Sequence, residues 1–326
     1  MRIVRSYQLC SPNEYNCTVI IGNFDAVHKG HQHIITQAKA IAKLHNNSKV
    51  AILTFEPHPA VVVKKSNGNI RILPLSEKIR HLANAGIEVL FLQRFSQDFA
   101  NLSAADFIKE VLVDKLKVVH LVVGQNFRFG ANKAGDVQTL KDLGKKQGIG
   151  VSIIDLLETS IGTYSSSQIR HSLKNGDIES ANRILGYNYY ITGKVIKGDN
   201  RGKSIGFPTA NIALKNILSP LDGVYLVKVY IDGRSKTYYG VANIGSAPTF
   251  DRADSLLEVH IFDFNEQIYG KKIRVELLKY IRAQQKFNNI DKLILQIQKD
   301  VRIAKENIQT NASANYNFSG IYPRSV

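Results

Sequence analysis

The chain has 326 residues, of which 44% are hydrophobic and 21% charged, a composition typical of a folded protein with a sizeable core. Its length exceeds that of an average domain, so two domains are expected, and the composition gives no sign of large-scale disorder. The net charge of +16 favours anionic partners in general, but the basic residues form no long block, so the charge alone indicates a solvated surface.

The first half of the chain alternates short apolar runs with helical patterns. Strands are expected at 19–21, 50–53, 89–92 and 118–123, and helices over 34–42, 79–83 and 107–116. This order predicts an α/β, Rossmann-like domain whose parallel sheet is covered on both faces. Ligands of such sheets bind at the carboxyl ends of the strands.

After about residue 185 apolar and polar residues alternate, with glycines near most strand boundaries. Strands are expected at 189–195, 225–231, 238–243, 257–262 and 273–277. The pattern predicts a small antiparallel β-barrel followed by one amphipathic helix. The expected division is a first domain over 1–185, a second over 186–308 and an irregular tail over 309–326.

The turn between the first strand and the first long helix is the strongest candidate site. It contains Gly22, Asn23, Phe24, Asp25, His28, Gly30 and His31. Gly30 allows the backbone to approach a bound group closely, and the helix amino terminus offers N–H donors to phosphate. His28 and His31 can then donate to oxygens that gain charge when an α-phosphate is attacked. A lone histidine is usually structural, but this concentration of residues favours a functional site that binds phosphate.

Residues 22–31 resemble the His-x-Gly-His signature of the nucleotidyl transferase superfamily, and residues 1–308 resemble the bacterial bifunctional riboflavin kinases/FAD synthetases. Motifs at 54–59, 124–130 and 165–170 follow in that family's order. The resemblance implies phosphate binding by Ser165, Ser166 and Arg170, and flavin binding by Asn126, Arg128 and His58. From the residues alone, Asn126 is equally explained by turn chemistry and His58 by a rigid turn between prolines.

In the second half, residues 198–204 are glycine-rich but do not form a P-loop, because only three residues separate Gly198 from Gly202. We interpret this segment as a flexible flap in which Gly198 and Lys203 lie near phosphates. Thr209 and Asn211 are two residues apart, so in an extended segment both point to one side and offer oxygens that suit Mg²⁺.

Glu258 lies on the opposite side of its predicted strand from Leu257 and Val259. A carboxylate placed there can accept the proton of an attacking hydroxyl, although a surface glutamate on a barrel strand is the simpler explanation. The motifs at 206–211 and 258–260 resemble riboflavin kinase signatures. The resemblance implies Mg²⁺-ATP held by Thr209 and Asn211, with Glu258 as the base for the ribityl hydroxyl.

The resemblance as a whole implies phosphorylation of riboflavin to FMN in the second domain and adenylylation of FMN to FAD in the first. Riboflavin, FMN and ATP are then the partners and Mg²⁺ the cofactor, with no nucleic acid or membrane partner. Three departures from the family pattern are visible: Ala26 replaces a usual Gly, Ala247 a common Arg, and Ala283-Gln284 a usual Pro-Glu.

Two alternatives stay open. The departures at 247 and 283–284 allow an FMN adenylyltransferase with a degenerate kinase domain. An RNA-binding protein related to the class I tRNA synthetases would suit the charge, but the sequence has no Lys-Met-Ser-Lys-Ser loop and no RNA-recognition aromatic motif.

The compartment is predicted from the cysteines and the apolar runs. Cys10 and Cys17 are too few for a disulfide framework or a zinc site, so free thiols are expected. The first residues lack the apolar stretch of a signal peptide, and no apolar run is long enough to span a bilayer. A cytoplasmic location is expected.

Overall fold

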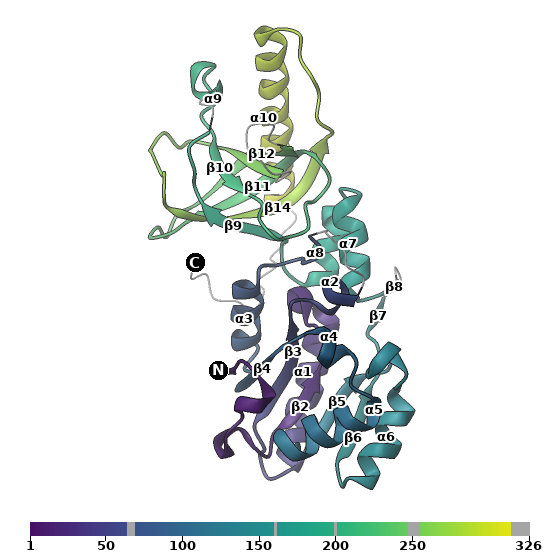
Figure 1. The fold of residues 1–326 in the computed structure, drawn as a ribbon. Coiled ribbons are helices and arrows are strands. Elements are labelled where there is room, and N and C mark those ends of the chain that lie inside the picture. The colour runs from purple at the N-terminus through teal and green to yellow at the C-terminus, as the bar shows by residue number, and fades with distance from the viewer. Residues whose placement is uncertain (64–68, 160–161, 199–200, 247–254, 314–326) are drawn as a thin grey trace. The chain divides into compact units, whose positions relative to one another are not determined.

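The computed structural model describes residues 1–63, 69–159, 162–198, 201–246 and 255–313 (Figure 1). The chain divides into two compact units, Met1–Ser166 and Ser167–Val326. This division lies 19 residues before the predicted domain boundary after residue 185, so the two helices between them are counted with the second unit. Among the described residues no helix is long and apolar enough to cross a membrane.

The first unit is built on a six-stranded sheet in the order β1-β4-β3-β2-β5-β6, in which neighbouring strands are parallel. The strands are β1 (Arg2–Val4), β2 (Thr18–Ile21), β3 (Val50–Glu56), β4 (Val89–Arg94), β5 (His120–Gly124) and β6 (Gly150–Ile154). The α-helices are α1 (Lys29–Leu44), α2 (Pro59–Val63), α3 (Leu75–Asn84), α4 (Gln97–Ala100), α5 (Ala104–Asp106) and α6 (Val137–Lys146). The π-helical segment η4 (Phe107–Lys115) continues α5. A two-stranded hairpin, β7 (Glu158–Thr159) and β8 (Gly162–Thr163), follows the sheet.

Both faces of this sheet are covered because successive side chains of each strand point to opposite sides. Ile20 of β2 packs in a core with Ile35 of α1 and Leu82 of α3. Its neighbour Val19 packs in the other core, against residues such as Val111 of η4. The continuous apolar strands therefore fit a buried parallel sheet, and the α/β prediction is confirmed.

The second unit is an antiparallel sheet of six strands in the order β10-β13-β12-β11-β14-β9. The strands are β9 (Tyr190–Lys194), β10 (Ala210–Ala213), β11 (Gly223–Ile231), β12 (Thr237–Ser246), β13 (Ser255–Ile261) and β14 (Lys272–Arg282). A bridge between Ile196 and Asn211 joins the segment after β9 to β10 at the other end of the order. The sheet thus closes into the predicted small barrel.

The helices of the second unit are α7 (Ser166–Lys174, which begins at the last residue of the first unit), α8 (Ile178–Leu185), α9 (Arg201–Ser204) and α10 (Ile290–Ser313). The helical turn α9 lies in the segment predicted as a flexible flap. Helix α10 extends beyond residue 308, so the prediction of an irregular tail is wrong for 309–313, because the helical pattern continues through polar residues. Residues 314–326 of that tail lie outside the described residues.

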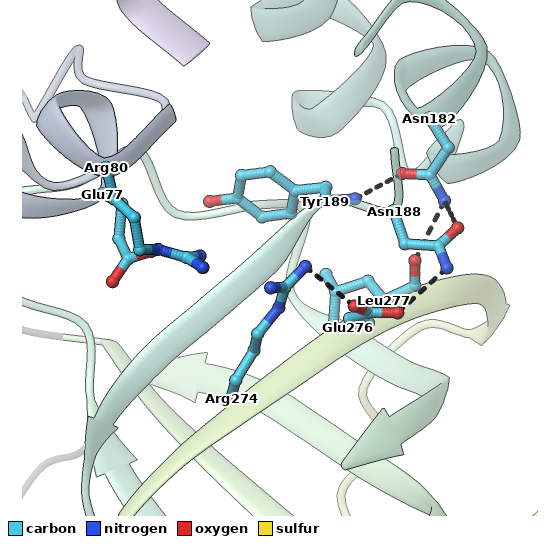
Figure 2. A network of polar contacts seen from close by, with 8 residues as sticks. All are labelled: Glu77, Arg80, Asn182, Asn188, Tyr189, Arg274, Glu276 and Leu277. Atoms are coloured by element: carbon cyan, nitrogen blue, oxygen red, sulfur yellow. Dashed lines mark hydrogen bonds and ion pairs between the residues drawn. The ribbon is translucent and has the colours of Figure 1, made fainter. Parts of the chain in front are cut away.

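Helix α8 is tied to the barrel by a buried polar network (Figure 2). The Asn182 amide donates to the carbonyl oxygen of Leu277 at 3.0 Å and accepts from the backbone N–H of Tyr189 at 2.7 Å. The Asn188 amide donates to the Glu276 carboxylate at 3.0 Å. Buried polar groups cost free energy unless they are paired, so these contacts favour one docking position of α8 on β14.

Candidate active sites

The motifs of the first unit follow neighbouring strands. The turn that begins at Gly22 follows β2, His58 follows β3, and Asn126 follows β5, and the order of these strands in the sheet is β3-β2-β5. Strands β3 and β4 lie on one side of β2 and strands β5 and β6 on the other. The carboxyl ends of β2 and β5 therefore form a topological switch point, where open parallel sheets bind ligands.

The turn at the carboxyl end of β2 has an unusual backbone. Phe24, Ala26 and Val27 have φ angles of 49°, 67° and 44°, in the left-handed region. That region costs an L residue roughly 1–2 kcal/mol, and it is least favourable for a β-branched side chain such as Val27. Ala26, the departure from the family's Gly, therefore occupies a position whose φ favours glycine. Such a turn persists only where its surroundings hold it.

Several side chains hold this turn. The Lys78 ammonium donates to the carbonyl oxygen of Asn23 at 2.6 Å and to the Thr54 hydroxyl at 2.8 Å. The Ser166 hydroxyl donates to the carbonyl oxygen of Asp25 at 3.2 Å. The structure thus brings Thr54 and Ser166, which belong to two of the other predicted motifs, into contact with the turn of the motif at 22–31. Lys78 was missed by the sequence analysis, because a lysine in a helical pattern usually lies on the surface.

The two histidines meet at the start of α1. The Nδ1 atom of His28, the N-cap residue, accepts from the backbone N–H of His31 at 3.4 Å. Their rings stack with centroids 3.7 Å apart, and the Phe24 ring lies 4.7 Å from that of His31. A Cβ atom on Gly30 would lie 2.8 Å from the carbonyl oxygen of Tyr164, so only glycine fits there. Both imidazoles therefore lie at a helix amino terminus, where an anion is stabilised.

The side chains predicted to bind flavin are more exposed to solvent than His28. Asn126 and Arg128 are exposed in the loop after β5, and Arg128 forms an ion pair with Asp136 at 3.4 Å. The Nδ1 atom of His58 accepts from the backbone N–H of Ala60 at 3.2 Å at the start of α2. This contact fits the turn role that the sequence analysis left open for His58.

An aromatic cluster that the sequence analysis did not single out lies at the same edge of the sheet. Its ring centroids are 5.5 to 6.1 Å apart along the series Phe55, Phe95, Phe99, Phe107, Phe129 and Phe127. The last two rings are stacked, with an interplanar angle of 9°. The residues come from β3, the loop after β4, α4, η4 and the loop after β5. Only the fold gathers them, so the sequence signal was limited to the alternation of Phe127 and Phe129 with Asn126 and Arg128.

The predicted phosphate ligands of the 165–170 motif lie at the start of a helix. Ser165 directly precedes α7, and Ser166 is its first residue. Arg170 is four residues further along, so it shares a helix face with Ser166.

In the second unit, three polar residues form a row across neighbouring strands. Glu258 of β13 pairs in register with Asn211 of β10 on one side and with Asn243 of β12 on the other. Directly opposed residues of antiparallel strands point to the same face. Leu257 and Val259 are fully buried on the other face, which agrees with the predicted orientation of Glu258. The candidate base and a candidate metal ligand thus lie side by side.

The side-chain oxygen of Asn211 is buried and has the chemistry of a metal ligand. Its side chain is 5% exposed, and among the described residues none donates a hydrogen bond to its Oδ1 atom. A Cβ atom on Gly198 would lie 2.3 Å from the Asn211 amide nitrogen, so the glycine leaves room for this side chain. A buried oxygen without a donor is costly, and an amide oxygen is a hard ligand that suits Mg²⁺. Thr209 precedes β10 by one residue.

The surroundings of Glu258 include one of the family departures. The Asn243 amide donates to the Glu258 carboxylate at 3.4 Å, and the Gln284 amide donates to the Asn243 side-chain oxygen at 3.2 Å. Gln284 therefore contacts Asn243, the residue that donates to the candidate base. Ala247, residues 199–200 and the side chain of Lys203 lie outside the described residues.

Comparisons with known proteins match both halves of the chain. The family model of FAD synthetase matches residues 10–168, and that of riboflavin kinase matches residues 185–308. The bifunctional riboflavin kinase/FMN adenylyltransferase of Bacillus subtilis is 40% identical over 306 residues, which cover 92% of this chain and 95% of that protein. The protein of that name from Escherichia coli is 36% identical over 307 residues, covering 94% of this chain and 97% of the other.

A solved structure resembles the whole chain as well. It is a crystal structure described as a macrolide-efflux protein from Streptococcus pneumoniae, with a TM-score of 0.81 and 31% identity, and the match covers 93% of this chain and 98% of that one. Together, the two family models and the relatives that match over nearly their full length place this chain in the family of bifunctional riboflavin kinases/FMN adenylyltransferases.

Proposed function

We propose that the second unit phosphorylates riboflavin to FMN with ATP, and that the first unit adenylylates FMN to FAD with ATP and releases pyrophosphate. The observation that carries this proposal is that each half matches its own enzyme family, and a candidate site in each half supports it. The stacked histidines at the start of α1 serve the first reaction, and the row of Asn211, Glu258 and Asn243 serves the second.

In adenylyl transfer, a phosphate oxygen of FMN attacks the α-phosphate of ATP, and the bond to pyrophosphate breaks. No covalent enzyme intermediate is needed, so the protein contributes position and charge stabilisation. His28, His31 and the N–H groups at the start of α1 are assigned to the phosphate oxygens that gain charge. Gly30 allows the close approach of ATP, and Ser165, Ser166 and Arg170 are assigned to its phosphates.

The flavin of this reaction is assigned to the aromatic cluster beside the turn. A planar ring system stacks favourably on aromatic side chains, and the partly exposed Phe127, whose ring stacks on the buried Phe129, offers such a surface. Asn126 and Arg128 alternate with these rings, so their amide and guanidinium groups are assigned to the polar part of FMN. His58 is the least supported of the predicted flavin ligands, because its Nδ1 atom caps α2.

In the kinase reaction, the terminal hydroxyl of riboflavin attacks the γ-phosphate of ATP, and the bond to the departing ADP breaks. Glu258 accepts the hydroxyl proton, and Asn243 orients its carboxylate. Thr209 and Asn211 are assigned to Mg²⁺, which arrives with ATP and neutralises charge on the phosphate oxygens when bound.

The free thiols of Cys10 and Cys17 fit a reducing compartment, so we expect the protein in the cytoplasm.

Two substitutions in the full chain test the separation of the sites. His28→Ala is expected to reduce FAD formation from FMN by about 100-fold or more, because charge stabilisation at the α-phosphate is lost, while FMN formation stays near wild type. Glu258→Ala is expected to abolish FMN formation from riboflavin, while FAD formation from directly supplied FMN stays near wild type. Chromatographic assay of both conversions checks this, with circular dichroism as the control for folding. If either substitution removed both activities from a folded protein, the assignment of separate sites would be wrong.

A further inference from the structure

Lys78 is a buried cation beneath the proposed adenylyl transfer site. It lies in α3, its residue is 8% exposed, and its ammonium group is enclosed by protein. Burial of an unpaired charge is costly, so an ammonium at this depth needs compensating contacts. An apolar residue of similar length would avoid this cost, and the lysine therefore needs an explanation other than packing.

The contacts of Lys78 converge on one backbone oxygen. Its Nζ atom donates to the carbonyl oxygen of Asn23 at 2.6 Å and to the Thr54 hydroxyl at 2.8 Å. The Thr54 hydroxyl donates to the same carbonyl oxygen at 3.0 Å. Asn23 directly precedes the residues with left-handed backbone, and His28 ends the same turn. The anchor and the candidate catalytic imidazole thus lie at opposite ends of one strained segment.

Burial has the largest influence on the pKa of Lys78, and three nearby charged groups add to it or oppose it. Asp25 of the turn and Glu56 of β3 raise its pKa, whereas Arg71, which precedes α3, lowers it. Two of these groups have other partners, since Glu56 pairs with Arg71 and the Asp25 carboxylate accepts from the backbone N–H of Ile72 at 3.1 Å. Burial outweighs the carboxylates and lowers the pKa of Lys78 to about 8.

We propose that Lys78 is a positioning residue for adenylyl transfer, whose ammonium anchors Asn23 and holds the strained turn so that His28 and His31 face the α-phosphate of ATP. This inference rests on the proposed function of the first unit. When Lys78 loses its proton, the charge-assisted contact to the carbonyl oxygen weakens. The turn can then relax, and a misplacement of about 1 Å at a reacting centre costs on the order of 100-fold in rate.

The effects of pH on activity and on stability have opposite signs. The pKa of Lys78 is lowered from 10.5 to about 8 in the folded protein. Between these values the unfolded chain binds the proton more strongly, so the contribution of Lys78 to the free energy of unfolding rises with pH. A loss of FAD formation in this window therefore cannot come from unfolding driven by Lys78.

The experiment measures kcat for FMN to FAD and for riboflavin to FMN on the same full-length chain, from neutral pH to about pH 10. In the wild type we expect FAD formation to fall with a midpoint near pH 8, without a parallel fall in FMN formation. Lys78→Met should lower kcat for FAD formation at neutral pH by at least about 10-fold and remove this dependence, with FMN formation unchanged. Lys78→Arg keeps the charge, so the fall should move to higher pH. Lys109→Met, at an exposed lysine of the same unit, should match the wild type.

Several outcomes would overturn the proposal. Wild-type kcat for FAD formation in Lys78→Met, or persistence of the fall near pH 8 in that variant, would show that Lys78 does not position the site. If Lys78→Met failed to fold, the profiles of the wild type and Lys78→Arg would decide, and identical profiles would reject the role. A wild-type chain that forms no FAD at any pH would reject the proposed function itself, whereas normal FAD formation with a flat profile would reject only the role of Lys78.

Discussion

At the scale of single residues, the two proposed sites use neighbouring groups to hold a reactive side chain. In the first unit the strained turn at 24–27 ends at His28. In the second unit Asn243 donates to the Glu258 carboxylate, and Gln284 donates to Asn243. The departure from the family's Pro-Glu at 283–284 thus leaves a hydrogen-bond donor in contact with Asn243. The presence of Gln284 is therefore no reason to regard the kinase site as degenerate.

Substitution of Asn243 tests this arrangement. Asn243→Ala removes the donor to Glu258, so we expect kcat for FMN formation to fall by about 10-fold, in the range of one lost charge-assisted hydrogen bond. Asn243→Asp should be more damaging, because it places a second carboxylate beside Glu258. Steady-state assays of FMN formation, with FAD formation from FMN as the internal control, measure both effects. Equal activity of the two variants would contradict the proposed contact.

The candidate site residues could be predicted from the sequence, whereas the residues that hold them in position could not. The histidines, the glycine between them and the row members Asn211 and Glu258 stand in recognisable local patterns. Lys78 and Asn243 act through partners 55 and 15 residues away, and periodicity carries no information on such distant contacts. Lys78 in particular resembles an ordinary surface residue of an amphipathic helix until the fold places it beneath the turn.

At the scale of elements, most of the sheet strands were predicted, whereas several elements, including the ten-residue helix α6, were not. Strands β2 to β5, the barrel strands β9 and β11 to β14, and helix α10 were expected close to their observed positions. The strands β1, β6 and β10 were missed, because β1 has only three residues and because Ser152 and Asn211 interrupt the apolar runs of β6 and β10. The π-helical form of η4 was also not predicted, because its apolar spacing resembles that of an α-helix.

Helix α10 is joined to strand β14 by a buried ion pair, besides the apolar packing of Val301, Ala304 and Ile308. The Arg282 guanidinium donates to both carboxylate oxygens of Asp300, with distances from 2.7 to 3.1 Å, and the Asp300 side chain is 3% exposed. Loss of one partner leaves the other charge poorly compensated, so Asp300→Ala is expected to lower the free energy of unfolding of the second unit by about 3 kcal/mol.

Urea denaturation followed by circular dichroism and by loss of FMN formation measures this effect. Lys299→Ala, at an exposed position of the same helix, is the matched control and should change stability little. An unchanged urea midpoint in Asp300→Ala would contradict the importance of the Arg282–Asp300 pair.

At the scale of the whole molecule, the sequence predicted a parallel α/β half and an antiparallel barrel half, and both are confirmed. The order of strands within each sheet came only from the structure, because a sequence pattern does not say which strands become neighbours. The family matches, which end at 168 and begin at 185, leave most of α7 and α8 between them, whereas the division into compact units after Ser166 counts both helices with the second unit. The predicted boundary at 185 stays a prediction.

The most direct test of the account is to incubate the purified chain with riboflavin and Mg²⁺-ATP and to separate the flavins by chromatography over time. We expect FMN to appear first and FAD to follow, since the product of the second unit is the substrate of the first. If riboflavin stayed unchanged while added FMN became FAD, the kinase assignment would be wrong. If a folded sample converted neither flavin, the assignment of both activities to this chain would be contradicted.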